Sequence, residues 1–391
     1  MGNDAKNIIR FIIGSLDVGG AEIHLSRVLP RLKTDAFSPI VITLTHKGKL
    51  SKTLEESGVP VYEPSKFVRF MQQVPIFSRL AGPLLTIIYL LVMFIRIPAK
   101  ITCFYLPSSY YLGMIASIIF GDVSNTIMFR RSLNDYQKNI SYIRYFERLL
   151  HKRTNLIVGN CQAIIHQLMN DEGVSEKKLL RIYNGISIKK SPLSNNKHMA
   201  RTRLNIDDET IVLSIIANLL PYKGHHNLVE ALGMISNEIN QPWLLISAGA
   251  GIQKRQDLKD IVKEYNLTRN IRWLGQRDDV SDILLASDIG LLVSHQEGFS
   301  NAILENMAAS IPMIVTNVGG NSEAVVHGET GLIISPNRPR ELSEAIMVLI
   351  NDSELRKSYG ENARTRVEEH FSMKSCVDNY KKLFTELIDK R

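Results

Sequence analysis

The sequence predicts an α/β protein with two Rossmann-like, doubly wound parallel-sheet domains that face a cleft. Three observations support this fold class. The chain has 391 residues, which exceeds the roughly 100–150 residues of a typical single domain. Short, almost continuously apolar segments alternate with longer segments of helical pattern, as in a parallel sheet that is covered on both faces. The alternation also stops once, between residues 187 and 205, and then starts again.

The first half of the chain contains the first series of alternating elements. Its strand segments are short and apolar, and longer helical segments separate them. The expected strands are 8–13, 39–45, 59–61, 101–106, 126–129 and 156–158. The expected helices are 21–32, 50–57, 76–95, 109–119 and 142–151. These elements assign residues 1–190 to an N-terminal domain.

The second series follows a polar, basic segment. Residues 187–205 read SIKKSPLSNNKHMARTRLN, and this composition predicts a linker over 191–205. The strands expected after it are 211–217, 243–247, 271–274, 289–293, 313–316 and 331–334, with helices at 225–235, at 256–265 and from residue 301. They assign residues 206–370 to a C-terminal domain. A last helix, 373–389, is expected to return residues 373–391 to the first domain.

Charge is distributed unequally between the two halves. Residues 1–190 carry 25 Lys and Arg against 13 Asp and Glu, whereas residues 191–391 carry 22 against 26. The resulting net charges of +12 and −4 indicate that the first half seeks an anionic surface. The chain has no lysine-rich tail, CxxC finger or aromatic RNA-binding motif, so we expect an anionic membrane surface as partner and no nucleic acid.

The expected location is the cytoplasm, peripheral on the inner face of the cell membrane. The cysteines Cys103, Cys161 and Cys376 lie too far apart for a zinc framework or a disulfide scaffold, which favours a reducing compartment. The longest apolar run, 80–95, has 16 residues between Arg79 and Arg96. It falls short of the ~20 residues of a spanning helix, which leaves a buried helix or a helix resting on the membrane.

A glycine-rich loop follows the first expected strand. Residues 14–22 read GSLDVGGAE, and glycines let backbone N–H groups approach an anion at the start of a helix. The spacing differs from the dinucleotide fingerprint GxGxxG, and Thr43–Thr45 ends the second strand where that fingerprint has an acid. A simple turn that reverses the chain is the alternative interpretation.

Two segments of the second half carry charged residues at strand ends. In ANLLPYKG (217–224), Lys223 can reach a phosphate as a point charge, unless it is an ordinary surface lysine. In SHQEGFSNAILE (294–305), Ser300 can cap a helix, Glu297 lies in the loop and Glu305 on the helix. Free N–H groups near 299–302 would face an anion. Two carboxylates at this point suit a ligand with vicinal hydroxyls, a sugar or a ribose, although helix-surface glutamates are the simpler alternative.

Three further glycine loops follow strands of the second half, at 249–251, 275–280 and 318–323. Together with the two above, they predict a large phosphorylated ligand in the cleft. No HxxxH or clustered His/Asp pattern indicates a metal site, and no GxSxG or paired Cys/His pattern indicates nucleophilic hydrolysis.

These motifs together resemble those of a known family. The chain resembles family 4 glycosyltransferases of the GT-B fold in its GGAE (19–22), YNGI (183–186) and PYKG (221–224) segments. Glu297 and Glu305 match the E-x7-E pair of that family, and Gly319–Gly320 with Glu323 match a further motif. The resemblance covers nearly the whole chain and is strongest from 211 to 340.

The resemblance implies a metal-independent, retaining glycosyltransferase. It would move a sugar from a UDP- or GDP-sugar to a lipid-linked or saccharide acceptor, with no cofactor, and cell-surface polysaccharide assembly is the expected context. Lys223 and Glu297 would be catalytic, and residues 1–190 would form the acceptor side. The donor-binding residues implied are Gly19, Gly20, Asn218, Lys223, Gly275, Arg277, Glu297, Gly298, Phe299, Ser300, Asn301 and Glu305.

Two positions depart from the pattern of the family. Asn218 stands where the family usually has Arg, so one positive charge at the diphosphate is missing. Many members carry a His after the fifth strand of the first domain, where this chain has Phe129–Ser132. Arg130 and Arg131 are therefore expected on the acceptor or phosphate side, where either could supply the missing charge.

Three other functions compete with this interpretation. A GT-B-like sugar-nucleotide 2-epimerase would share the fold and the donor, but the basic first half and the apolar segment 80–95 argue against it. A non-catalytic sugar-nucleotide-binding subunit would not require Lys223, Glu297 and Glu305. A nicotinamide oxidoreductase is disfavoured by the loop spacing, and the absence of NAD binding would exclude it.

Overall fold

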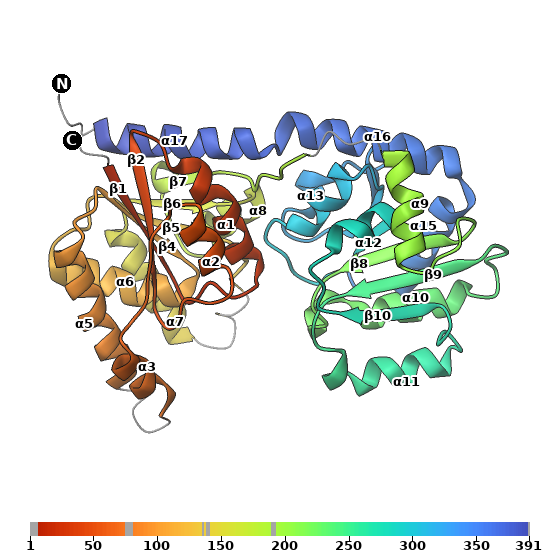
Figure 1. The fold of residues 1–391 in the computed structure, drawn as a ribbon, viewed down its shortest axis with the longest axis horizontal. Helices are drawn as coiled ribbons and strands as arrows, with labels where there is room; N and C mark the ends of the chain where they lie inside the picture. The colour runs from red at the N-terminus through yellow and green to blue at the C-terminus, as the bar shows by residue number, and fades with distance from the viewer. Residues whose placement is uncertain (1–6, 75–80, 135–136, 138–140, 189–192, 390–391) are drawn as a thin grey trace. The chain divides into compact units, whose positions relative to one another are not determined.

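The computed structural model describes residues 7–74, 81–134, 137, 141–188 and 193–389 (Figure 1). The chain divides into two compact units. Unit 1 comprises Met1–Gly185 and Met373–Arg391, and unit 2 comprises Ile186–Ser372. Each unit is built around one parallel sheet. The predicted fold class, two doubly wound α/β domains, is therefore confirmed for each unit.

Unit 1 contains a sheet of seven strands in the order β3-β2-β1-β4-β5-β6-β7. Every pairing is parallel. The order reverses between β1 and β4, and ligands of open α/β sheets bind beside such a point, at the carboxyl ends of the strands. The strands are β1 (Asn7–Ile13), β2 (Phe37–Thr43), β3 (Val61–Tyr62), β4 (Ile101–Tyr105), β5 (Thr126–Arg130), β6 (Leu156–Gly159) and β7 (Leu179–Arg181).

Most helices of unit 1 belong to one of two groups. The first group is α1 (Gly20–Leu32), α2 (Ser51–Glu56) and α17 (Met373–Asp389), in which α1 contacts both others. The second is a row of neighbours, α3 (Lys66–Gln73), α5 (Ala81–Arg96), α6 (Pro107–Phe120) and α7 (Ser141–Arg153). Helix α8 (Gln162–Asn170) contacts β6 and β7. The aromatic side chains of α17 (Tyr380 and Phe384) enter the same core as Leu25 and Leu29 of α1, so the last helix of the chain completes the first unit.

Unit 2 contains a sheet of six strands in the order β10-β9-β8-β11-β12-β13, again with parallel pairings. Its strands are β8 (Ile211–Ile216), β9 (Trp243–Ala248), β10 (Ile271–Gly275), β11 (Ile289–Leu292), β12 (Met313–Thr316) and β13 (Gly331–Ile334). Its helices are α9 (Leu193–Arg203), α10 (His225–Ile235), α11 (Gln256–Glu264), α12 (Val280–Ala286), α13 (Asn301–Ala308), α14 (Asn321–Ala324), α15 (Pro339–Asn351) and α16 (Ser353–His370).

The structure corrects the expected linker over 191–205. Residues 193–203 form helix α9, which packs against α12 inside unit 2. Tertiary charge pairs hold this polar helix in place, because Lys197 and Arg201 both bind Asp288, at 2.6 and 2.7 Å. The position at which the units divide, Gly185/Ile186, lies before this helix.

The apolar segment predicted at 80–95 forms α5, Ala81–Arg96. Residues 76–80 of the expected helix lie outside the described part of the chain. One face of α5 is buried through Gly82, Thr86, Leu90 and Phe94. Among the residues that the structure describes, none of the helices combines the length and the apolar character that crossing a bilayer requires.

Candidate functional site

The loops after β8 and β11 meet at the carboxyl end of the unit 2 sheet. The His295 N–H donates to the Tyr222 carbonyl at 2.7 Å. Gly224 has φ +73°, and a Cβ at this position would collide with the Val293 carbonyl oxygen. Only glycine adopts this conformation at such close range without cost. The PYKG loop therefore lies directly against the end of β11.

This contact places Lys223 beside Glu297. The Lys223 Nζ lies 2.5 Å from Glu297 Oε1, and the Ser294 hydroxyl donates to the same oxygen at 2.7 Å. The exposed fractions of the two charged side chains are 17% and 10%. Partial burial lowers the local dielectric constant and strengthens the pair. Lys223 and Glu297, for which the family resemblance implies a catalytic role, are thus held together. Ser294 orients the carboxylate of Glu297, a role that sequence reasoning missed.

The glycine pair after β12 supports the backbone of the Glu297 loop. Gly319 has φ +54°, and a Cβ there would collide with the Glu297 carbonyl oxygen. The Gly320 N–H donates to the Gly298 carbonyl at 2.7 Å. The loops at 297–298 and 318–320 therefore pack closely against each other. This agrees with their shared position at the carboxyl ends of neighbouring strands.

Helix α13 begins directly after this loop. Ser300 occupies its N-cap position, but its side chain accepts no hydrogen bond from the first turn, which corrects the expected cap. Asn301 is the first helical residue, and half-buried Glu305 follows one turn later. The Phe299 side chain is buried, with its ring centroid 5.3 Å from that of Phe371. The Phe299 side chain therefore packs inside unit 2.

The loops after β8, β9 and β10 are also connected. The Asn218 Oδ1 accepts a hydrogen bond from the Ala250 N–H at 2.9 Å, and the Gly249 N–H donates to the Gly275 carbonyl at 2.9 Å. Arg277 is exposed and pairs with Asp279 at 2.5 Å. Asn218 thus orders the neighbouring loop instead of supplying a charge.

A second cation lies in these loops that sequence reasoning missed. Arg255 donates to the Leu219 carbonyl at 3.1 Å and pairs with Asp257 at 2.6 Å. Its charge and that of Lys223 both act on His225, the first residue of α10. Burial is the largest cause that lowers the pKa of His225, to about 4. Within the described residues, neither ring nitrogen of His225 has a hydrogen-bond partner.

Unit 1 brings three predicted motif segments together at the carboxyl end of its own sheet. Gly19 is the N-cap of α1, where a Cβ would collide with the Glu22 carboxylate. Arg131 follows β5 and donates to the Asn184 Oδ1 at 2.6 Å. Burial raises the pKa of Glu22, and the charge of Arg131 acts against that rise. The GGAE, FRRS and YNGI segments therefore share one site, with half-buried Arg131 as its cation.

Arg130 does not belong to this site, which corrects half of the prediction for the two arginines. It is 2% exposed and binds Glu147 at 2.6 Å and Glu172 through its other terminal nitrogen. His151 lies 2.8 Å from the second Glu172 oxygen. Burial alone would raise the pKa of Glu172, but His151 and Arg130 together lower it. Arg130 is thus the centre of a buried ion-pair network.

The same network contains the one trio of described residues with metal-ligand spacing. One ligand atom each from Glu147, His151 and Glu172 lies within 4.8 Å of the others. Arg130 already neutralises both carboxylates, so a divalent cation would have to displace the guanidinium. The geometry therefore favours an ion-pair network over a metal centre.

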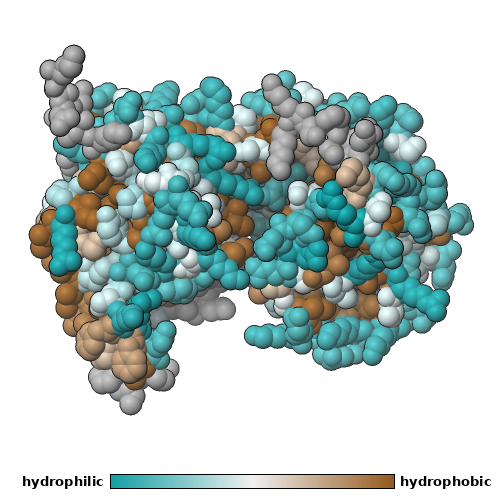
Figure 2. Space-filling model, in the orientation of Figure 1, coloured by the Kyte–Doolittle hydropathy of each residue, from teal (hydrophilic) through white to brown (hydrophobic). Residues whose placement is uncertain are grey.

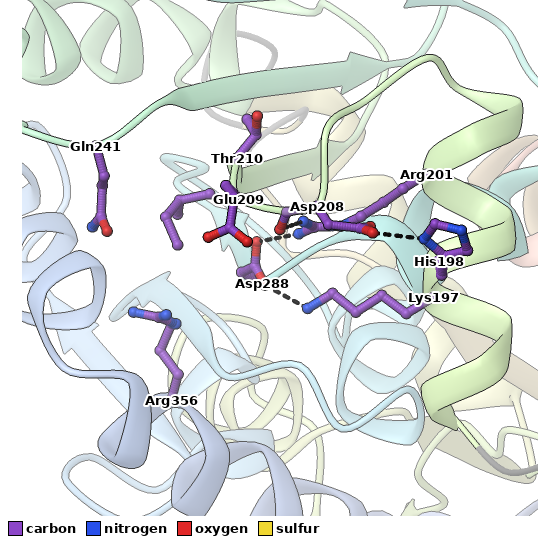
Figure 3. A pocket seen from close by; sticks show the side chains of 10 residues that line it. Lys197, His198, Arg201, Asp208, Glu209, Thr210, Gln241, Asp288 and Arg356 are labelled. Atoms are coloured by element: carbon purple, nitrogen blue, oxygen red, sulfur yellow. Dashed lines mark hydrogen bonds and ion pairs between the residues drawn. The ribbon is translucent and has the colours of Figure 1, made fainter.

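A surface depression of about 500 Å³ lies elsewhere in unit 2 (Figure 3). Thr210 and Asp288, which precede β8 and β11, place it at the amino end of the sheet, opposite to Lys223 and Glu297. Several of its charged groups bind one another: Asp288 pairs with Lys197 and Arg201, and His198 pairs with Asp208 (Figure 3). These pairs attach α9 to the sheet. The depression is therefore separate from the candidate site, which lies at the carboxyl end of the sheet.

Comparison with known proteins assigns the domain that carries this site. Residues 196–366 match the family model of Glycosyl transferases group 1. This group 1 domain covers most of unit 2 and includes Lys223, Ser294, Glu297 and Glu305. The corresponding part of the sequence prediction, a glycosyltransferase domain, is confirmed.

Several glycosyltransferases are similar to the chain. It is 24% identical over 382 residues to N-acetylgalactosamine-N,N'-diacetylbacillosaminyl-diphospho-undecaprenol 4-alpha-N-acetylgalactosaminyltransferase of Campylobacter jejuni, covering 95% of this chain and 98% of that protein. It is 27% identical over 238 residues to the capsular polysaccharide biosynthesis glycosyltransferase CapM of Staphylococcus aureus, covering 59% and 62%. The chain spans 59% to 65% of the length of several other curated relatives.

A solved structure supports the fold. HepE of Anabaena, in complex with UDP and glucose, matches with a TM-score of 0.82 and 22% identity over 96% of this chain and 99% of that protein. The predicted GT-B fold type is confirmed by this likeness.

Proposed function

We propose that the protein is a retaining glycosyltransferase that acts without a metal ion. It moves a sugar from a UDP- or GDP-sugar to a lipid-linked or saccharide acceptor in cell-surface polysaccharide assembly, at the cytoplasmic face of the membrane. The single observation that carries this proposal is the Lys223–Glu297 pair in the group 1 domain, oriented by Ser294 at the carboxyl end of the sheet.

The site offers different groups to different parts of a nucleoside diphosphate sugar. Lys223 supplies a positive charge for the diphosphate, and the first turn of α13 supplies N–H groups that Ser300 does not cap. We propose that Glu305 accepts hydrogen bonds from the ribose hydroxyls. Glu297 and the backbone at 298–300 bind the donor sugar. We propose Gly19 and Gly20 of unit 1 as further donor-binding residues.

Lys223 also acts on the leaving group. When the bond from the anomeric carbon to the phosphate oxygen breaks, its electron pair stays on that oxygen and the β-phosphate gains charge. Donors fixed in advance around this oxygen stabilise the transition state more than the ground state. Removal of one such donor commonly lowers the rate by about 10²–10³-fold.

Arg131 supports an acceptor that carries phosphate. Its guanidinium lies at the carboxyl end of the unit 1 sheet, where one terminal nitrogen donates to the Asn184 Oδ1 at 2.6 Å. Arginine binds phosphate groups through paired N–H donors. The C. jejuni relative is named for a diphospho-undecaprenol-linked substrate. We infer that a diphosphate-linked saccharide is the acceptor class that best fits this side.

A donor and acceptor screen tests the proposal. The chain is incubated with UDP- and GDP-sugars and a short polyprenyl diphosphate-linked saccharide, and products are analysed by mass spectrometry and by NMR of the new glycosidic bond. The expected product keeps the anomeric configuration of the donor. An inverted product contradicts the retaining mechanism. Conversion of the donor into its 2-epimer without acceptor supports the epimerase alternative instead.

A further inference from the structure

Exposed apolar side chains gather on one row of helices in unit 1. Eighteen large apolar side chains are exposed among the described residues, and twelve of them belong to α3, α5, α6 and α7. These four helices contact one another in series. Single exposed apolar residues are ordinary, but a contiguous group marks an interaction surface.

Helix α5 contributes a continuous stripe to this surface. Leu84, Ile88, Val92 and Ile95 are 58%, 47%, 38% and 67% exposed. Their spacing of four, four and three residues places them on one side of the helix. Since the opposite side is packed into unit 1, α5 is apolar all round. A helix of this kind requires an apolar environment on both sides.

The neighbouring helices extend the stripe at both ends. At the end of α6, Ile118–Phe120 are exposed, and the Phe120 ring lies 5.7 Å from that of Phe94 on α5. On α3, which contacts the start of α5, Phe67 and Phe70 are 64% and 62% exposed. Figure 2 shows brown, hydrophobic atoms over the region of α5 and its neighbours. We call Phe67, Phe70, the four α5 residues and Ile118–Phe120 the apolar face.

The chain segment that carries the apolar face is free of acidic residues, and the preceding Glu63 pairs with Arg69 at 3.1 Å. Residues 64–121 contain no Asp or Glu and five basic residues, Lys66, Arg69, Arg79, Arg96 and Lys100. Lys66, Arg96 and Lys100 are exposed at the borders of the apolar face. Basic residues that flank an apolar helix suit the headgroup layer of an anionic bilayer.

We propose that the apolar face docks on an anionic lipid bilayer, with α5 lying in the plane of the interface. This inference deepens the proposed function, because it names the surface that meets the membrane. The 16 residues of α5 span about 24 Å at ~1.5 Å per residue, less than the hydrocarbon core of about 30 Å. A second copy of the chain fits less well, since a symmetric pairing would bring the same basic residues together.

The position of α3 connects this face with the unit 1 site. The Gln72 amide of α3 donates to the Leu44 carbonyl at 3.0 Å and to Thr86 of α5 at 2.8 Å. Leu44 follows β2, and its N–H donates to the Gly14 carbonyl at 3.1 Å. The aromatic pair Phe67 and Phe70 therefore lies at the same sheet edge as the loop that leads to Gly19. Docking would bring this edge to the headgroups, where a lipid-linked acceptor is presented.

A label at Ile95 tests contact with lipid directly. The native cysteines are all buried, so Ile95→Cys can be labelled selectively with a polarity-sensitive fluorophore. The matched control is Val348→Cys on α15 of unit 2, at a position that is 47% exposed. With vesicles of equimolar phosphatidylcholine and phosphatidylglycerol, we expect a blue shift at 95 and none at 348. Equal spectra at 95 with and without vesicles overturn the proposal.

Substitutions test the contribution of the apolar face and of its charges. The variant Leu84→Ser/Ile88→Ser/Ile95→Ser should weaken vesicle binding by at least about tenfold, because it removes apolar area from the interface. The matched control Met234→Ser/Val348→Ser changes exposed residues of unit 2 and should bind like the wild type. Lys66→Ala/Arg96→Ala should weaken binding roughly 25-fold at low salt, about fivefold for each charge.

Further outcomes separate the alternatives. Failure of the wild type to bind anionic vesicles at low salt overturns docking, as does unchanged binding of the triple serine variant. A wild-type dimer that this variant makes monomeric, without vesicle binding, assigns the face to a second copy. Transfer to a water-soluble acceptor should be equal in the wild type and the triple variant. If neither the wild type nor the triple variant transfers a sugar, the proposed function is contradicted. The vesicle-binding measurement still tests the docking proposal in that case.

Discussion

At the scale of single residues, the ion pair between Lys223 and Glu297 has consequences for binding. The lysine that should hold the diphosphate is engaged by a carboxylate at 2.5 Å. Under the proposed function, an arriving diphosphate therefore competes with Glu297 for the same ammonium group. Binding of the donor must share Lys223 or move Glu297 toward the sugar. The pair thus couples the two proposed roles, and single substitutions at its members should have opposite effects on nucleotide binding.

We predict distinct phenotypes for the three charged residues of unit 2. Lys223→Ala should weaken the nucleoside diphosphate and lower kcat by about 10²–10³-fold. Glu297→Gln should keep or raise that affinity, because Lys223 loses its competing partner, while turnover falls. Glu305→Gln should weaken the nucleoside diphosphate by roughly 10–100-fold, from the loss of a hydrogen bond to a charged group. Calorimetry with the product nucleotide and initial rates with the donor measure the two effects separately.

The two glutamates serve as controls for each other. Loss of nucleotide binding in Glu297→Gln with normal binding in Glu305→Gln would invert the assignment. If neither variant changes binding or rate, both carboxylates are structural.

Arg130 and Arg131 show what a sequence can and cannot specify at this scale. The resemblance to family 4 glycosyltransferases makes both residues candidates, because they stand where many members of that family carry a His. Successive residues at a strand end point to opposite sides of the sheet. Arg130 therefore enters a cluster with Glu147 and Glu172, while Arg131 reaches Asn184. Glu147 comes from α7 and Glu172 from the turn after α8. How these two segments pack decides which side of the sheet holds the carboxylates, and no local sequence pattern contains that information.

We predict that Arg130→Met and Arg131→Met differ in stability and activity. Arg130→Met leaves two buried carboxylates without their cation and should lower the free energy of unfolding by about 3–5 kcal/mol. Arg131→Met should leave the unfolding transition nearly unchanged and lower the transfer rate, with partial rescue in Arg131→Lys. Chemical denaturation and initial rates with a diphosphate-linked acceptor distinguish them. Equal loss of stability in both variants would show that Arg131 is structural.

At the scale of elements, strands and glycine loops were predictable, while several helices were not. Buried parallel strands are short apolar runs, and glycines such as Gly224 and Gly319 mark close approaches of backbone. Helix α9 lacks an apolar stripe and depends on pairs with Asp288, which is distant in the sequence. Helices α3, α8, α12, α15 and α16 and strand β7 also have no counterpart in the sequence prediction. Their stability comes from tertiary contacts that local periodicity does not report.

Helix α10 should impose a pH dependence through its first residue. The pKa of His225 is lowered from 6.5 to about 4, so the unfolded chain binds more protons between these values. Stability should therefore fall as the pH decreases from 6.5 toward 4, by about 3 kcal/mol in total. His225→Leu should remove this slope and keep the stability at pH 7. Denaturation series at several pH values measure it.

His226 provides the matched control for this experiment, because it is the next residue of α10 and is exposed. His226→Gln should leave the slope between pH 6.5 and 4 as in the wild type. A wild-type slope in His225→Leu would show that other groups produce the pH dependence.

At the scale of the whole molecule, charge is the property that the sequence predicts best. The net charges of +12 and −4 for the two halves follow from counting alone. The acid-free segment 64–121 lies within the basic half and carries the apolar face. Counting does not reveal which apolar residues are exposed, because that depends on the packing of α5 against α6. Composition therefore predicts a partner of opposite charge, and the structure adds the surface proposed for it.

The final prediction concerns removal of metal ions from the whole protein. The proposed chemistry uses Lys223 and helix N–H groups at the diphosphate, and Arg130 occupies the one described trio with metal-ligand spacing. EDTA should therefore leave both the transfer rate and the thermal unfolding midpoint nearly unchanged, and added Mg²⁺ or Mn²⁺ should not raise the rate. Enzyme assays and thermal scans on the same EDTA-treated sample measure both. If EDTA abolishes activity but leaves the unfolding midpoint unchanged, the metal ion acts at the donor site. A lowered unfolding midpoint after EDTA would instead indicate an ion bound to Glu147, His151 and Glu172, and Glu172→Gln should abolish that shift.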